Sequence, residues 1–268
     1  MLDCLSFLNP ILPLWGVCEY PGDLPPSARK SRLPEGAQCV VAAAFPYRLP
    51  EEYYAGRNIS RYAVPRDYHA LCGARLERAC ALLREAFPGE IFTPFCDNSP
   101  LPEVALAERA GLGARGRHNL LITPEYGTWV FLGEIVTTAV LPLPAPCLLT
   151  PHPCGGCAAP CIAACPVGFG KTKCLSAVTQ RKGELSPEEE RQILCAHSAW
   201  GCDLCQEACL ANQSVCINPL PEFLIDAVAH VTEQTPVAGR AYAWRGEGTM
   251  QRNLKICGAK RGSPAAGG

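Results

Sequence analysis

Residues 154–166 read CGGCAAPCIAACP, and residues 202–209 read CDLCQEAC. The first stretch is spaced Cys154-x2-Cys157-x3-Cys161-x3-Cys165 and ends in Pro166, the second is Cys202-x2-Cys205-x3-Cys209, and Cys174 lies between the two stretches. Closely spaced cysteines followed by one directly before a proline form the ligand pattern of iron–sulfur ferredoxins. These eight cysteines therefore predict two [4Fe-4S] clusters in a small ferredoxin-like domain.

The position of the proline also predicts how the cysteines are shared. In two-cluster ferredoxins the cysteine before proline binds the neighbouring cluster. That rule pairs Cys154, Cys157 and Cys161 with Cys209, and it pairs Cys165 with Cys174, Cys202 and Cys205. Zinc is the competing metal, because Cys-x2-Cys units also form tetrahedral zinc sites. We expect the other ten of the 18 cysteines to be small core residues, with Cys195 and Cys216 as alternative ligands.

Length and charge narrow the class of protein. A chain of 268 residues can form one domain of ordinary size and a smaller one. The formal net charge of −1 gives no basic signature of nucleic-acid binding. The N-terminus lacks the basic region of a signal peptide, and no apolar run is long enough to span a membrane. We therefore expect a cytoplasmic protein that uses its thiols for metal binding rather than for disulfides.

The residues before the cysteines carry strand and helix patterns. We expect strands at 38–45, 91–96, 119–122 and 128–137, and helices at 67–87 and 101–112. These elements predict an α/β sandwich over residues 37–146, preceded by an irregular segment at 1–36. The cluster domain should span residues 147–218 and contain a helix that begins at Ser186-Pro187. Residues 219–268 should hold a helix at 222–230 and end in a disordered tail from residue 262.

Several short stretches resemble one known family. They are SRYA (60–63), RDYH (66–69), DNSP (97–100), AERAGLG (107–113), GRHNLLI (116–122), GTWVFLGE (127–134), KCLS (173–176) and GCDLCQEAC (201–209). As a set they resemble the epoxyqueuosine reductase family, from about residue 32 to residue 212. A weaker match returns at QRNL, residues 251–254.

The resemblance implies a nitroreductase-like α/β sandwich that binds cobalamin, packed against the double [4Fe-4S] domain. It implies the reduction of epoxyqueuosine in tRNA to queuosine, with electrons delivered through the clusters to cobalamin. Asp97 matches the acid that protonates the leaving oxygen in this family. The residues that match a segment near the cofactor are Arg61, Tyr62, Asp67, Tyr68 and His69.

Some features depart from the family pattern and leave the substrate open. Arg117 and His118 occupy positions where the family more often has Lys and Asn. The N-terminal part is shorter than in typical members, and the chain ends where longer members continue into helical repeats that help hold tRNA. A tRNA partner is thus only weakly supported, whereas an external low-potential electron donor is required.

Two other functions remain compatible with these motifs. One is a related corrinoid and iron–sulfur reductase acting on a small molecule, as in the similar reductive dehalogenases. The other is a non-catalytic iron–sulfur electron-transfer protein.

Overall fold

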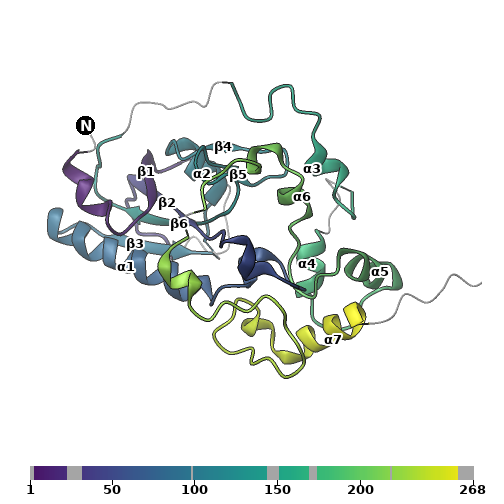
Figure 1. Cartoon of the computed structure of the whole chain (residues 1–268). Helices are drawn as coiled ribbons and strands as arrows, with labels where there is room; N and C mark the ends of the chain where they lie inside the picture. Colours follow the sequence, from purple (N-terminus) through teal and green to yellow (C-terminus); the bar gives the residue numbers. More distant parts are fainter. Residues whose placement is uncertain are drawn as a thin grey trace, which may run out of the picture.

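The computed structural model describes residues 3–22, 32–97, 99–143, 151–168, 174–217 and 219–258. A mixed α/β part is built on a four-stranded sheet, and a cysteine-rich helical part lies beside it (Figure 1). No helix in the described ranges is long and apolar enough to cross a membrane.

The sheet is antiparallel throughout. Its strands are β1 (Leu14–Glu19), β2 (Cys39–Pro46), β6 (Val130–Thr137) and β3 (Phe92–Cys96), in the spatial order β1-β2-β6-β3. Every residue of β2 is buried, because this strand is paired along both edges and covered on both faces. A two-stranded sheet of β4 (Ala114–Arg115) and β5 (Leu121–Ile122) lies apart from the larger one.

One helix covers each face of the large sheet (Figure 1). Side chains alternate between the faces of a strand, so Val41, Ala43 and Phe45 of β2 join the core cluster that includes α1 (Tyr68–Ala86). The intervening β2 residues, Val40, Ala42 and Ala44, join the core beneath α2 (Glu103–Arg109). The 3-10 turns of this part are η1 (Asp3–Leu8), η3 (Glu51–Tyr54) and η4 (Arg61–Ala63).

The cysteine-rich part consists of short helices. In chain order they are α3 (Pro160–Ala163), α4 (Leu175–Gln180), α5 (Pro187–Ala196), α6 (Leu204–Glu207), η5 (Leu210–Asn212), η6 (Pro221–Leu224), η7 (Ala243–Arg245) and α7 (Glu247–Gly258). Helices α4 and α5 share a small core of Leu175, Val178 and Ile193, against which Ile256 of α7 packs. The α7 helix is anchored by Asn253, whose Nδ2 donates to the carbonyls of Thr179 and Ala199, both at 2.7 Å.

Two expectations drawn from the sequence are wrong. The segment 1–36 is not irregular throughout, because residues 14–19 form edge strand β1 with six paired residues on β2. The helix expected at 222–230 stops as η6 at Leu224, and the chain then extends so that Val228 N donates to Val64 O at 2.9 Å. Asp226, with a φ of 53°, closes that turn. The tail expected from residue 262 lies outside the described residues.

Candidate functional site

Four cysteines from three separate segments gather on one side of the helical part. The pKa of the Cys205 thiol is raised to about 12, first by burial and then by Cys202, Cys174, Asp203 and Cys165. The pKa of Cys202 is raised to about 11, by burial and by Asp203, Cys174 and Cys165. We call Cys165, Cys174, Cys202 and Cys205 the inner group.

The other four candidate ligands form a second set, the outer group of Cys154, Cys157, Cys161 and Cys209. The pKa of Cys209 is raised by burial and then by Cys161, Cys154 and Cys157. Arg117 donates to the carbonyl oxygens of Cys157 at 3.3 Å and Cys154 at 3.4 Å, which fixes the loop that carries both thiols. The electrostatic neighbours of Cys205 and Cys209 agree with the grouping from the proline rule, and the assignment of these thiols to two clusters stays a prediction.

The choice between two cubanes and zinc stays a prediction for these thiols. Among the residues with described positions, no group of three or more His, Cys, Asp or Glu is placed to hold a metal ion. Each thiolate around a [4Fe-4S] cubane binds a different iron, so its ligands stand farther apart than the four ligands of one zinc ion. Two groups of four thiols provide the number of ligands that two cubanes need.

A cavity of about 740 Å³ lies between the sheet and the inner group. The α/β part contributes Asp97, Tyr68 and His69 to its wall, and all four inner-group cysteines contribute to the opposite side. Cavities of several hundred cubic ångströms with a few convergent polar groups are typical of cofactor sites. Titratable side chains and the four inner-group cysteines thus line one cavity.

Asp97 follows β3 and has a left-handed backbone with a φ of 56°. Its Oδ2 accepts a hydrogen bond from Tyr68 OH at 3.2 Å and lies 3.0 Å from His69 Nε2. The other ring nitrogen of His69, Nδ1, lies 2.6 Å from Asp67 Oδ1. Asp67 and then Asp97 raise the pKa of His69 to about 10. At neutral pH His69 therefore holds a proton beside Asp97.

An aromatic stack forms the wall next to Asp97. Tyr68 stacks on Phe131 with ring centroids 3.9 Å apart, and on His69 at 4.1 Å. Tyr62 meets the edge of Tyr68 at 6.4 Å. Burial raises the pKa of both tyrosines, so each phenol stays neutral and can donate a hydrogen bond. This wall offers a flat apolar surface bordered by proton donors.

The cofactor-segment residues named from the sequence divide between two places. Tyr62, Tyr68 and His69 line the cavity. Asp67 supports His69 from behind, and its side chain also caps α1 by accepting from His69 N at 3.1 Å. Arg61 is not among the described residues of the cavity wall; its guanidinium pairs with Glu51 at 3.1 Å and lies 4.2 Å from the Tyr54 ring.

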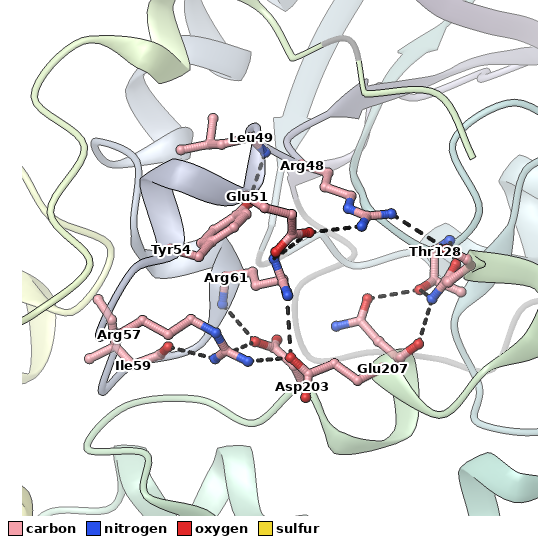
Figure 2. Close-up of polar contacts among 12 residues, drawn as sticks. Arg48, Leu49, Glu51, Tyr54, Arg57, Ile59, Arg61, Thr128, Asp203 and Glu207 are labelled. Carbon is pink, nitrogen blue, oxygen red and sulfur yellow. Dashed lines mark hydrogen bonds and ion pairs between the residues drawn. The ribbon is translucent and has the colours of Figure 1, made fainter. Parts of the chain in front are cut away.

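Arg61 belongs to a polar network that joins the α/β part to the second cysteine stretch (Figure 2). Its backbone N–H donates to Asp203 Oδ2 at 2.7 Å, and Arg57 Nη1 donates to the same oxygen at 3.2 Å. Farther along, Asn212 accepts from Thr128 N at 2.8 Å and donates to Gln206 O at 2.7 Å. These contacts fix the inner group relative to the sheet.

Two residues of the cavity wall, Trp244 and His118, were not assigned to the site from the sequence. Trp244 lines the cavity although its side chain is 58% exposed, and the guanidinium carbon of Arg245 lies 3.7 Å from its ring centroid. His118 also lines it, and burial lowers its pKa. The ring is thus neutral, and Nδ1 accepts from Leu120 N at 3.2 Å. Only the folded arrangement brings these residues to the site.

An antiparallel sheet covered by a helix on each face shares one cavity with a cysteine-rich helical part, which defines a two-part architecture. Residues 28–98 match the family model described as "Epoxyqueuosine reductase QueG, DUF1730". An epoxyqueuosine reductase of Gloeobacter violaceus is 32% identical over 255 residues, which cover 86% of this chain and 76% of that protein. The chain belongs to the epoxyqueuosine reductase family.

Solved structures agree with this assignment. Epoxyqueuosine reductase from Streptococcus thermophilus has a TM-score of 0.76 and 25% identity, with 96% of this chain and 80% of that chain covered. An epoxyqueuosine reductase bound to an epoxyqueuosine-modified tRNA-Tyr stem loop has the same fold, with a TM-score of 0.75, 24% identity and coverage of 95% and 80%. The chain covers 55% and 54% of the length of two other curated relatives, which is about half of each.

Proposed function

We propose that this chain is a cobalamin- and iron–sulfur-dependent reductase that converts epoxyqueuosine in tRNA to queuosine. The observation that carries the proposal is the shared cavity, whose wall contains Asp97 and His69 on one side and the inner cysteine group on the other. A reductase of this kind needs a proton donor and an electron source at one substrate. The cavity provides a place for both.

The outer and inner groups are the proposed ligands of the two [4Fe-4S] clusters, with four thiolates for each. The cavity between the aromatic stack and the inner group is the proposed cobalamin site. When bound, these groups would supply single electrons from an external low-potential donor and a reduced cobalt for the chemistry. The inner group borders the cavity, so the cluster that it would hold is the proposed electron donor to cobalamin.

The reaction consumes two electrons and two protons, because the epoxide oxygen leaves as water and an alkene remains. Asp97 is the proposed donor to that oxygen. Tyr68 donates to the Asp97 carboxylate, and protonated His69 lies beside it, so the proton that Asp97 delivers first passes to it from His69. His69 can return a proton to Asp97 after transfer.

The tRNA partner is supported by the fold relative that was solved with a modified stem loop. The net charge of −1 gives this chain little general attraction for phosphate. We therefore expect recognition to centre on the modified nucleotide in the cavity, with weak contacts to the backbone that diminish with salt.

The direct test is turnover. Purified protein, reconstituted with iron, sulfide and cobalamin and then reduced, should convert an epoxyqueuosine-bearing stem loop to queuosine, measured by mass spectrometry of the nucleosides. The free epoxyqueuosine nucleoside, run in parallel, distinguishes a tRNA enzyme from one that acts on small molecules. Protein that binds both cofactors and reduces neither substrate would overturn the proposal.

The Asp97→Asn variant tests the acid. It keeps the size and much of the hydrogen bonding of Asp97 but removes its transferable proton. General acid catalysis contributes on the order of 100- to 10,000-fold, so turnover should fall in that range while both cofactors stay bound. Glu108→Gln, on the exposed side of α2, is the matched control and should keep parental turnover. Turnover of Asp97→Asn within a few-fold of the parent would remove Asp97 from the role.

A further inference from the structure

Asp203 lies between two cysteines of the inner group, Cys202 and Cys205, and its side chain is only 1% exposed. Arg61 N and Arg57 Nη1 both donate to its Oδ2 (Figure 2). Its Oδ1 is buried and has no hydrogen-bond partner among the described residues. The second oxygen of this carboxylate is therefore left without any donor to spread its charge.

Asp203 raises the pKa of both neighbouring thiols, Cys202 and Cys205, as a nearby negative charge does. The charged groups around Asp203 are Arg57, Arg61 and Glu207. Arg57 and Glu207 pair with each other and reach solvent, with side chains 23% and 34% exposed. Asp203 is enclosed instead, and a buried charge is screened far less than an exposed one.

A fixed negative charge beside a redox centre opposes the addition of an electron. Net charge near the sulfurs is one of the factors that set the reduction potential of an iron–sulfur cluster. The outer group should escape this effect, because the groups that act on Cys209 are its own partners Cys161, Cys154 and Cys157. The two clusters are thus expected to respond differently to a change at Asp203.

We propose that Asp203 lowers the reduction potential of the cluster held by the inner group, and that Arg57 partly opposes it. The inference rests on the proposed function, in which the inner-group cysteines are cluster ligands. Asp203 acts through the cluster and is a positioning residue. Its effect is to make the cluster beside the cavity the stronger reductant.

The test is a reductive titration of intact, reconstituted protein at pH 8 with dithionite, followed by electron paramagnetic resonance. The parent should show two cluster signals, and Cys174→Ser assigns the inner one as the signal that it alters. In Asp203→Asn, which still accepts from Arg61 N, the inner signal should move to higher potential. The outer signal should not move, which provides an internal control.

Arg57→Gln gives a second, independent arm, because removal of the opposing charge should move the inner signal to lower potential. Glu51→Gln is the matched control, since it removes a carboxylate from the same network at Arg61 but away from the cysteines. If the inner potential is unchanged in both Asp203→Asn and Arg57→Gln, or if both signals move together, the inference fails while the cluster assignment stands. A parent with fewer than two cluster signals would overturn the cluster assignment itself.

Discussion

His69 is held between two carboxylates, and this decides the ionisation state of the site. Asp67, on Nδ1, is the larger cause of its raised pKa of about 10, and Asp97, on Nε2, is the second. The protonated ring is present below that pKa and is lost as the pH rises through it. A reaction that draws its proton from this chain should therefore slow on the alkaline side.

The Asp67→Asn variant tests this dependence. Asn keeps the cap on α1, because both residues are good N-caps, but it no longer stabilises the imidazolium. The pKa of His69 should fall, and the alkaline limb of turnover should move to lower pH. NMR titration of the His69 ring measures the pKa without turnover, and Glu77→Gln on the exposed side of α1 is the control. An unshifted His69 pKa in Asp67→Asn would contradict the assigned cause.

Glu134 is a buried carboxyl on the α2 face of the sheet, with only 1% of its surface exposed. Its pKa is raised to about 8 by burial, then by Glu103, while a hydrogen bond from Ser99 opposes the shift. The folded protein thus binds this proton more tightly than the unfolded chain does. Stability should fall as pH rises from about 4.5 toward 8.

The Glu134→Gln variant should lose this part of the pH dependence. Gln can keep the hydrogen bond to Ser99 and carries no charge to bury, so the variant should gain stability over the parent at pH 9 and not at pH 5. The full difference is of the order of a few kcal/mol. Thermal unfolding of both proteins at the two pH values measures it, and a constant difference in Tm would refute the shift.

At the residue scale, cysteine spacing and family motifs allowed the candidate site residues to be named from the sequence. The two groups of four thiols follow from the proline rule, and Asp97, Tyr68 and His69 follow from the family motifs. Asp203 and Trp244 could not be predicted as functional, because an acidic loop residue and an isolated tryptophan have no periodic signature. The proposed role of Asp203 depends on its burial and on neighbours from a distant segment, whereas exposed Trp244 reaches the cavity wall only through the fold.

At the scale of elements, the strongly patterned segments were predicted well. The bounds of β2, β3, β6 and α1 were predicted from apolar periodicity to within about two residues, and the start of α5 was predicted from its cap. The short strand β1 was missed, because LWGVCE lies in a proline-rich segment and forms only by pairing with β2. The α7 helix was also missed, because its position depends on the hydrogen bonds of Asn253 and on packing with α4 and α5.

Helix α5 allows a test of how far a capping box in the local sequence stabilises a helix. The Ser186 hydroxyl accepts from Glu189 N, and Glu189 Oε2 accepts from Ser186 N at 2.8 Å, which together make a capping box. Ser186→Ala should cost about 1 kcal/mol. Urea unfolding measures the loss, with Ser214→Ala in an exposed loop as the control. Equal stability of the two variants would show that α5 is held by tertiary packing alone.

At the scale of the whole molecule, one tight contact joins the two parts. Gly127 has a φ of 58°, and a Cβ built there would lie 2.1 Å from Asn212 Oδ1. Asn212 is buried, and its side chain bonds Thr128 N and Thr128 Oγ1, both at 2.8 Å, and Gln206 O at 2.7 Å. The turn before β6 is therefore fitted to the loop that follows the outer-group residue Cys209.

The effects of substitutions at Gly127 and Asn212 on stability should be energetically coupled. Asn212→Ala leaves buried groups unpaired, at about 1–3 kcal/mol for each, and Gly127→Ala drives a methyl group into the Asn212 amide. In the double variant the amide is gone, so the clash is relieved and only the backbone strain of a left-handed alanine is added. The combined loss of stability should thus be smaller than the sum of the single losses by at least about 1 kcal/mol. Additive losses in urea unfolding would show that the two parts are not held together through this contact.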